Sequence, residues 1–455
     1  MKKNIKVKFF SVLAIFSLFI PWISEPAIAD GGFGVYDRDM DSWRLQDMKE
    51  QAAAINYENG MENMILTINP TELRGEKAVW VFPVPAAPQK TAVDIIAGFP
   101  RFSGRDVELM LQNNIQSSLG LMASSQIYPV FPFGMLLVSM GGVRSVDYNN
   151  VSVYEHIDKM GLSTELVSAK DGSSLADYLA GKDLGLPPAM KPLLDEYAGK
   201  DYSFVVSWIS NIDQFNAERN NIDAGNRNAK NNSIGVSIIF PTDKIFFPMK
   251  VTGVYESAKI PMLVYVVGHV TPKIDNLLSE FTQTSYYVDS EYDTAAEFLG
   301  FFNNKSNIGN LTYTKIMINA PSKYLSDDLW MDSKAPLKIS FLYWLNAFYW
   351  ILGIIIFAAI SAAASILAAI LTFGRNNVSK KKFALFGQWN FLTLIAVAIQ
   401  AKRIKIKQPT AELKEKLARE GFTIAEPKGS NFAAWFSFIF ILILIGLRII
   451  INFIF

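Results

Sequence analysis

The stretch "AVWVFPVPAAP", Ala78–Pro88, joins a strand-like apolar run to three prolines within six residues. Proline has no backbone N–H, and alternate residues of a strand donate toward the same side. Pro83 and Pro85 therefore remove two donors from one edge of this strand. The pattern predicts an edge strand that pairs on one side only and turns into an extended exit.

The sequence around this stretch predicts an α+β domain with a mixed or antiparallel sheet and interspersed helices. Runs rich in Val, Ile and aromatic residues are typical of strands, and they occur at 51–57, 63–68, 78–84, 151–155, 202–209, 233–240, 249–254 and 262–267. Helices fit 106–124, 173–180, 188–198 and 294–302, and the asparagine-rich 220–232 is predicted to be a flexible loop. No strict βαβ rhythm connects these elements.

Aromatic–proline steps recur at 99–100, 128–129, 131–132, 240–241 and 247–248. The residue before a proline is held in an extended conformation. We interpret these steps as rigid strand ends, in preference to a peptide-binding role.

The charge of the chain is divided into opposed blocks. The chain has 455 residues, of which 50% are hydrophobic, and a formal net charge of +1. It is long and apolar enough to form two or three domains with a buried core. Residues 30–338 hold 26 Lys and Arg against 37 Asp and Glu, a net of −11, whereas 375–430 hold 12 against 4, a net of +8. The two blocks are predicted to lie on opposite sides of a membrane. The absence of cysteine excludes a disulfide framework and a thiolate metal cluster.

The first 29 residues are predicted to be a cleavable signal peptide. Four lysines precede an apolar run from Phe9, and Ala27-Ile28-Ala29 forms a small-residue cleavage site. The alternative is an uncleaved anchor. Either reading makes residues 30–338 an extracytoplasmic domain.

Residues 339–374 carry no charge over 36 positions. One helix of that length would be about 54 Å long, against a hydrocarbon core of about 30 Å. Tyr343, Trp344, Tyr349 and Trp350 are predicted to form an outer aromatic belt, which leaves 351–373 as the span proper.

A second transmembrane helix is predicted at 431–455. Arg448 near its far end is predicted to snorkel to the headgroups, and a buried ion pair is the alternative. Segment 383–401 is uncharged but contains Gln388, Asn390 and Gln400. If it spanned, a loop with eight Lys and Arg would lie outside, against the positive-inside rule. We therefore expect 383–401 to be in-plane or re-entrant within a basic cytoplasmic region, 375–430. The protein is expected in the cell membrane, multi-pass, with its large N-terminal domain outside.

Several stretches occur in the order seen in one bacterial exported family. They are "ADGGFG", "QAAAINYENGMENMILTINP", "AVWVFPVPAAP", "YEHIDKMGLSTELVSAKDGSSLADYLAGKDLGLPPAMKPLLDEYAGKDYSFVVSWIS", "GVSIIFPTDKIFFPMKVTG" and "PMLVYVVG". Residues 30–268 thus resemble the family catalogued as domain of unknown function 2330 (DUF 2330). The resemblance implies an exported, often membrane-anchored domain and brings no established activity or catalytic residues. Cysteines frequent near the mature start of that family are missing here.

Few residues of the sequence indicate a catalytic or metal-binding site. Asp37, Asp39 and Asp41 alternate like the first ligands of a calcium loop, but Ser42 and Met48 replace the glycine and glutamate that such a loop requires. A solvated acidic loop is the preferred interpretation, and no metal or cofactor is expected. Only two histidines exist, both read as structural, since a zinc site needs three or four ligands. The sequence has no phosphate-binding glycine loop and no G-x-S-x-G elbow.

Two functions remain open. The sequence favours a non-enzymatic binding or assembly module, with the lipid bilayer as one expected partner and a membrane protein as a further candidate partner. An extracytoplasmic hydrolase using paired carboxylates is the alternative, and a cleft with convergent acids and a raised carboxyl pKa would favour it. Nucleic acid is not an expected partner of a domain with a net charge of −11.

Overall fold

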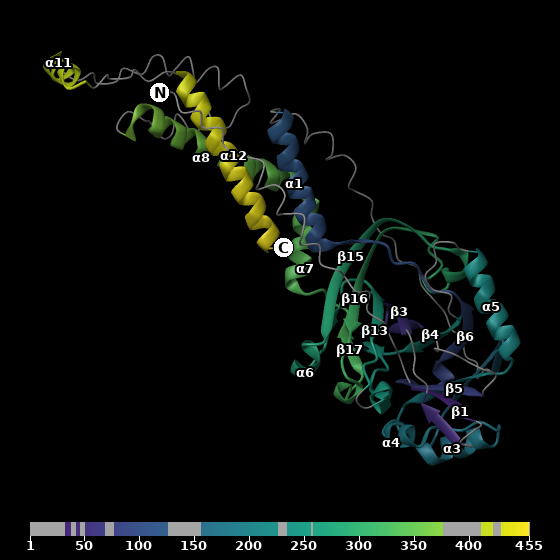
Figure 1. The fold of residues 1–455 in the computed structure, drawn as a ribbon. Coiled ribbons are helices and arrows are strands. Elements are labelled where there is room, and N and C mark those ends of the chain that lie inside the picture. Colours follow the sequence, from purple (N-terminus) through teal and green to yellow (C-terminus); the bar gives the residue numbers. More distant parts are fainter. Residues whose placement is uncertain are drawn as a thin grey trace.

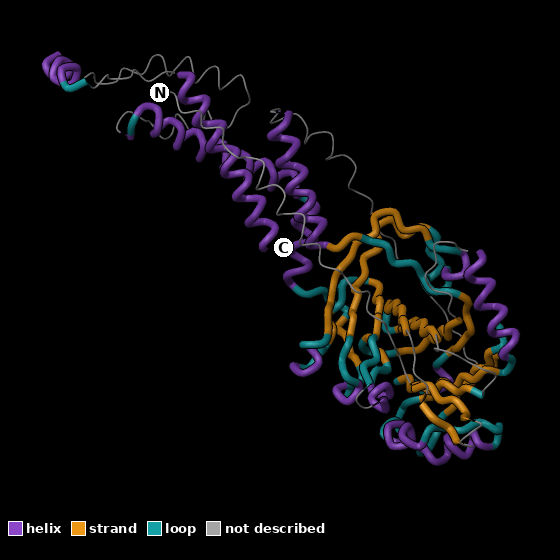
Figure 2. Tube along the Cα trace, in the orientation of Figure 1, coloured by secondary structure: helices purple, strands orange, loops and turns teal. Residues whose placement is uncertain are grey.

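The computed structural model describes residues 32–37, 42–45, 51–68, 77–125, 156–225, 234–255, 258–375, 411–421 and 429–454. They form an α+β body with mixed sheets, followed by two apolar helices, so the α+β class predicted from the sequence is confirmed. The strands gather in the body, and the long helices lead away from it (Figure 2).

The first sheet of the body has six antiparallel strands. In spatial order they are β2 (Ser42–Leu45), β1 (Gly32–Asp37), β5 (Ala78–Val84), β10 (Ser203–Ile209), β9 (Leu162–Val167) and β8 (His156–Lys159). The stretch quoted at the outset is β5, with the predicted bounds, and all seven of its residues are buried.

The prediction that β5 is an edge strand is wrong, because β5 pairs with β1 on one side and β10 on the other. The register shows why prolines are tolerated there. Strand β1 covers only Ala78–Val81, whereas Pro83 pairs with Phe204 of β10 alone. Pro83 thus lies where β5 extends past the end of β1, so its missing N–H costs no hydrogen bond to β1. The prediction of pairing on one side only is correct for this C-terminal part of β5.

The second sheet has eight strands and is mixed, since β3 and β13 are parallel and the other neighbours antiparallel. Its order is β6 (Ala92–Ala97), β11 (Ile234–Pro241), β4 (Met61–Ile68), β3 (Gln51–Glu58), β13 (Met262–Val267), β16 (Asn307–Ile318), β15 (Thr282–Asp293) and β7 (Arg105–Asp106). Asn59 and Gly60 join β3 to β4 with φ of 54° and 79°. An Asn-Gly pair suits this two-residue turn, because both positions need positive φ.

A small third sheet contains β12 (Ile245–Phe247), β17 (Leu329–Asp332) and β14 (Thr271–Pro272). One buried cluster joins all three sheets to helices α3 (Gly172–Ala180) and α4 (Lys191–Asp195), which lie near β1 and β5 in Figure 1. Trp80, Phe82 and Phe204 are fully buried in it. Burial of each such side chain stabilises the fold by roughly 1.5–3 kcal/mol.

The body also contains the helices η1 (Pro88–Lys90), η2 (Pro188–Met190), α5 (Ile212–Gly225), η3 (Lys250–Tyr255), α6 (Asn276–Ser279), η4 (Ala296–Phe298) and η5 (Ser322–Tyr324). Three of these helices correct predictions made from the sequence. The strand predicted at 249–254 is wrong, because η3 is a 3-10 helix there. Its residues are mostly buried, and a short buried apolar run looks alike in both conformations. The helix predicted at 294–302 is reduced to η4, and residues 220–225 of the predicted loop belong to α5. The strand predicted at 151–155 lies outside the described residues.

Five helices of the described residues extend away from the body: α1 (Val107–Ser125), α7 (Leu337–Ala347), α8 (Tyr349–Phe373), α11 (Ala411–Arg419) and α12 (Gly429–Ile454). The uncharged run 339–374 is therefore two helices, which meet at Phe348. Helices α8 and α12 run antiparallel, since Phe357 packs on Phe440 and Phe373 on Phe432. The C-terminal end of α12 returns toward the body, and α11 lies at the far end of the helical part (Figure 1).

Two helices in the described part are long and apolar enough to cross a membrane, Tyr349–Phe373 and Ala434–Ile451. Arg448 is exposed in the second of them, near the end that returns to the body. The predicted signal peptide, 1–29, and the segment 383–401 lie outside the described residues.

Candidate functional site

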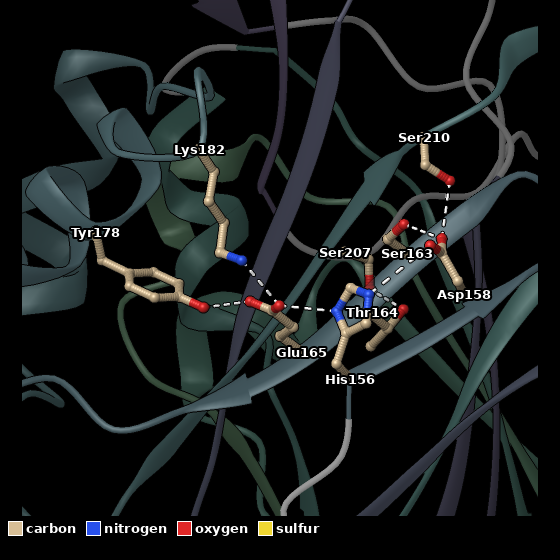
Figure 3. A network of polar contacts seen from close by, with 9 residues as sticks. All are labelled: His156, Asp158, Ser163, Thr164, Glu165, Tyr178, Lys182, Ser207 and Ser210. Atoms are coloured by element: carbon tan, nitrogen blue, oxygen red, sulfur yellow. Dashed lines mark hydrogen bonds and ion pairs between the residues drawn. The ribbon is translucent and has the colours of Figure 1, made fainter.

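A network of polar contacts connects the β8–β9 hairpin to α3 and to the residues that follow it (Figure 3). Met160 and Gly161 connect the two strands with φ of 56° and 73°. A Cβ on Gly161 would lie 2.6 Å from Phe215 N, so only glycine fits this turn. The turn brings His156 of β8 opposite Glu165 of β9.

Glu165 is the centre of this cluster. Its carboxylate accepts hydrogen bonds from His156 Nδ1 at 2.8 Å, from Lys182 Nζ at 2.9 Å and from the Tyr178 hydroxyl. Burial alone would raise the pKa of Glu165, but these hydrogen bonds outweigh it and the pKa is lowered. Lys182 Nζ also lies 5.2 Å from the ring centroids of both Tyr178 and Trp208. Glu165 is therefore a stably charged carboxylate that joins α3 to the sheet.

Asp158 forms the other half of the cluster. It accepts hydrogen bonds from the Ser163 hydroxyl and, at 3.1 Å, from the Ser210 hydroxyl, and the bond from Ser163 lowers its pKa. His156 Nε2 lies 3.7 Å from Asp158. In this arrangement the serine hydroxyls donate to a carboxylate and not to the imidazole, so neither serine is set up as an activated nucleophile. The cluster is an electrostatic clamp between strands and helix.

A cleft of about 830 Å³ opens where several strands end. Pro85, Ala86 and Ala87, directly after β5, form one part of its lining. The remaining lining residues are Gly60 in the β3–β4 turn, Lys90 in η1, Asp201 before β10, Pro241 at the end of β11, Thr242, Asp243 and Lys244 between β11 and β12, Lys273 after β14 and Trp330 in β17. Two proline-ended strands, β5 with Pro85 after it and β11 with Pro241 at its end, thus border one cleft of mixed charge, and Trp330 is the aromatic residue of its lining.

One half-buried acid, Asp328, and one fully buried acid, Glu62, lie close in sequence to residues of the cleft. Asp328, two residues before Trp330, accepts a hydrogen bond from the Tyr197 hydroxyl at 2.8 Å and from Lys250 N at 3.0 Å, yet burial raises its pKa to about 6. Glu62 is fully buried, and burial raises its pKa well above the ordinary value. Its Oε2 accepts a hydrogen bond from Phe246 N at 2.8 Å, while Oε1 has no partner among the described residues. Neither acid lines the cleft.

The two histidines have different surroundings. His156 has charged neighbours in the sequence, Glu155 and Asp158, and its side chain is 51% exposed and lies between two carboxylates. His269 is half-buried where the body meets α7. Its Nε2 lies 3.0 Å from Tyr287 O, and its ring packs edge-on against Tyr286 and Tyr343 of α7. Burial lowers the pKa of His269.

Of the calcium candidates, Asp37 ends β1, whereas Asp39 and Asp41 lie outside the described residues. In the parts of the chain that the structure describes, no three His, Asp or Glu side chains gather as a metal site would require.

Sequence reasoning did not single out Glu165 or Asp328. His156 and Asp158 stand two residues apart in a strand, which puts them on one face, and this spacing is the only signal of the cluster. Asp328 is held by residues more than 75 positions away, so nothing local marks it.

A scan against protein-family models found no matching family, and searches of curated proteins and of solved structures found no match. The resemblance to DUF 2330 therefore stays a prediction.

Proposed function

We propose that this chain is a membrane-anchored protein whose α+β body lies outside the cytoplasm and acts as a non-enzymatic binding or assembly module. The observation that carries the proposal is the antiparallel pair α8 and α12 at one end of the body, with large apolar side chains directed outward.

The length and exposure of the pair support anchoring. Helices of 25 and 26 residues are about 37–39 Å long, enough for a hydrocarbon core of about 30 Å. The core helix of a water-soluble protein is mostly buried, whereas only 6% of the residues from Ala434 to Ile451 are buried. Its exposed apolar residues are Trp435, Phe438, Ile441, Leu442, Ile445, Ile449 and Ile450.

The charge blocks support the orientation. Helix α11, at the end of the helical part away from the body, belongs to the block with a net charge of +8, whereas the block containing the body has −11. Lys and Arg near membrane spans stay cytoplasmic. The signal-like start, 1–29, supports export of the body. These features favour a cell-membrane protein with two spans.

Binding is favoured over catalysis by the positions of the acids. A hydrolase of the paired-carboxylate kind needs two acids facing a common substrate site. The raised carboxyl pKa of Asp328 is one sign of such chemistry, but Asp328 and Glu62 lie outside the lining of the cleft. The two acids that do line it, Asp201 and Asp243, share it with three lysines, Lys90, Lys244 and Lys273, as suits a binding surface of mixed charge. We therefore assign the cleft to binding, with a membrane-protein partner or an extracytoplasmic ligand as its occupant.

The proposal is tested by purifying the intact protein from membranes with its partners, in parallel with two variants. Ala87→Trp fills the cleft, and Ala180→Trp adds the same side chain at an exposed site in α3. We expect all three proteins to resist alkaline extraction from membranes and Ala87→Trp alone to lose the partner. Extraction of the wild type by alkali contradicts anchoring, and equal partner recovery in both variants contradicts binding at the cleft.

A further inference from the structure

Helix α1 does not cover the body. It packs along α7 and the beginning of α8 (Figure 1). Asn114 Nδ2 donates a hydrogen bond to Asn346 Oδ1 of α7 at 2.9 Å, and Asn346 Nδ2 donates to Val107 O at 3.4 Å. Further along, a Cβ on Gly353 of α8 would overlap the Ser118 hydroxyl and lie 3.1 Å from Ser118 Cβ. The absence of a side chain at Gly353 therefore lets the two helices approach closely.

Both helices lose their charges at the same level. Lys338 Nζ in the first turn of α7 lies 2.6 Å from Glu108 in the first turn of α1. Beyond this ion pair α1 carries no charged residue through Ser125, and α7 and α8 carry none through Phe373. The pair marks the boundary at which both helices leave the aqueous side.

The contacts of α1 fix its depth relative to the candidate span. Gly353 is four residues past Tyr349, and Phe357, which shares a buried cluster with Leu119, is eight past it. At 1.5 Å per residue these positions are about 6 and 12 Å beyond Tyr349 along the axis of α8. If Tyr349 lies at the headgroups, as the aromatic belt predicts, Ser118 and Leu119 lie below them.

The outer surfaces of α1 and α7 suit a lipid boundary. Leu121 is 64% exposed at the deep end of α1. Exposed apolar residues also follow one face of α7 at helical spacing: Leu337, Phe341, Trp344 and Phe348. The middle of α1 bears amides, including Asn113 and Gln116, which are suited to headgroup level. Polar side chains beside the belt and leucine below it match the gradient of an interface.

We infer that α1 is a third membrane-contacting helix, whose turns from Ser118 to Met122 lie among acyl chains in the leaflet on the side of the body. The partner of this surface is phospholipid. The inference rests on the proposed anchoring through α8, because the depth of α1 is defined by α8. The body is then held at the bilayer by the packing of α1 on α7 and α8 and by the contact of α1 and α7 with lipid.

The cysteine-free chain allows a direct test by single-cysteine fluorescence. Leu121→Cys and Gly120→Cys report on α1. Both sites are exposed, and a Cβ at Gly120 meets no atom within 4 Å. Leu367→Cys, 47% exposed in α8, is the membrane reference, and Leu277→Cys, 66% exposed in α6, is the aqueous reference. Each full-length variant is labelled with bimane and reconstituted in phosphatidylcholine vesicles, body outward.

We expect bimane at 120, 121 and 367 to be quenched by lipid carrying an acyl-chain nitroxide and protected from iodide, and bimane at 277 to behave in the opposite way. Quenching of 120 and 121 by iodide, with 367 protected, overturns the inference and leaves the anchoring intact. Quenching of 367 by iodide overturns both.

Discussion

Asp328 gives the sharpest prediction from the body. Its carboxylate is held by Tyr197 and Lys250 N, and burial raises its pKa from 3.8 to about 6. A raised pKa means that the folded state binds the proton more tightly than the unfolded state. The stabilisation is therefore complete below pH 3.8 and is lost as the pH rises through 6. Asp328→Asn stays neutral and should remove this loss.

The magnitude follows from the gap of about two pKa units, which corresponds to about 3 kcal/mol at neutral pH. For a domain of this size 1 kcal/mol shifts Tm by about 2–4 °C. Because about 0.5 kcal/mol of this stabilisation is already lost at pH 4, the Tm of Asp328→Asn minus that of wild type should grow by about 5–10 °C between pH 4 and pH 7.5. Partial exposure of Asp328 to solvent favours the lower end of this range.

Thermal unfolding of the detergent-solubilised full chain, followed by tryptophan fluorescence across this pH range, measures the effect. Asp177→Asn, at an exposed site in α3, is the matched control and should run parallel to wild type. Tyr197→Phe removes a hydrogen bond that lowers the pKa of Asp328, so its Tm should fall more steeply with pH. Parallel curves for wild type and Asp328→Asn would refute the assignment of a raised pKa.

Three further outcomes are expected. Phe82→Ala, at a fully buried site, should cost about 3–5 kcal/mol in urea unfolding, whereas Leu277→Ala should change stability by no more than about 0.5 kcal/mol; equal losses would contradict the core assignment. Glu165→Gln should destabilise by about 1–3 kcal/mol, and a double-mutant cycle with Lys182→Met should give a coupling above about 0.5 kcal/mol; zero coupling would exclude the clamp. Calcium should not raise Tm, and a rise lost in Asp39→Ala would restore the calcium hypothesis.

Local signals in the sequence predicted much of the first half of the fold. The strand-like runs predicted at 51–57 and 63–68 are β3 and β4, and the apolar run before Pro83 is β5. Strands β15 and β16 were not predicted, because their outer parts are polar and irregular. Their 12-residue pairing includes register shifts after Asp289. The position of β5 inside its sheet depends on β1, a pairing that no local pattern encodes.

The candidate site was less predictable than the fold. The hydrogen bonds of Glu165 join residues up to 17 positions apart, and those of Asp328 join residues 78 and 131 apart. Such groups meet only after the sheets have formed. The close approach of Gly353 to Ser118 is likewise a tertiary contact, although the charge-free sequence after Glu108 was a visible hint of it.

The proposed topology places the body outside the cytoplasm and the basic region 375–430 inside it, joined by two membrane spans. Single cysteines at Leu277→Cys in the body, at Ala418→Cys on the exposed face of α11 and appended after Phe455 test it in intact cells with a membrane-impermeant thiol reagent. With this topology we expect labelling at 277 and at the appended residue in intact cells, and labelling at 418 only after the membrane is permeabilised. Labelling at 418 in intact cells, without labelling at the appended residue, would mean three spans and would contradict it.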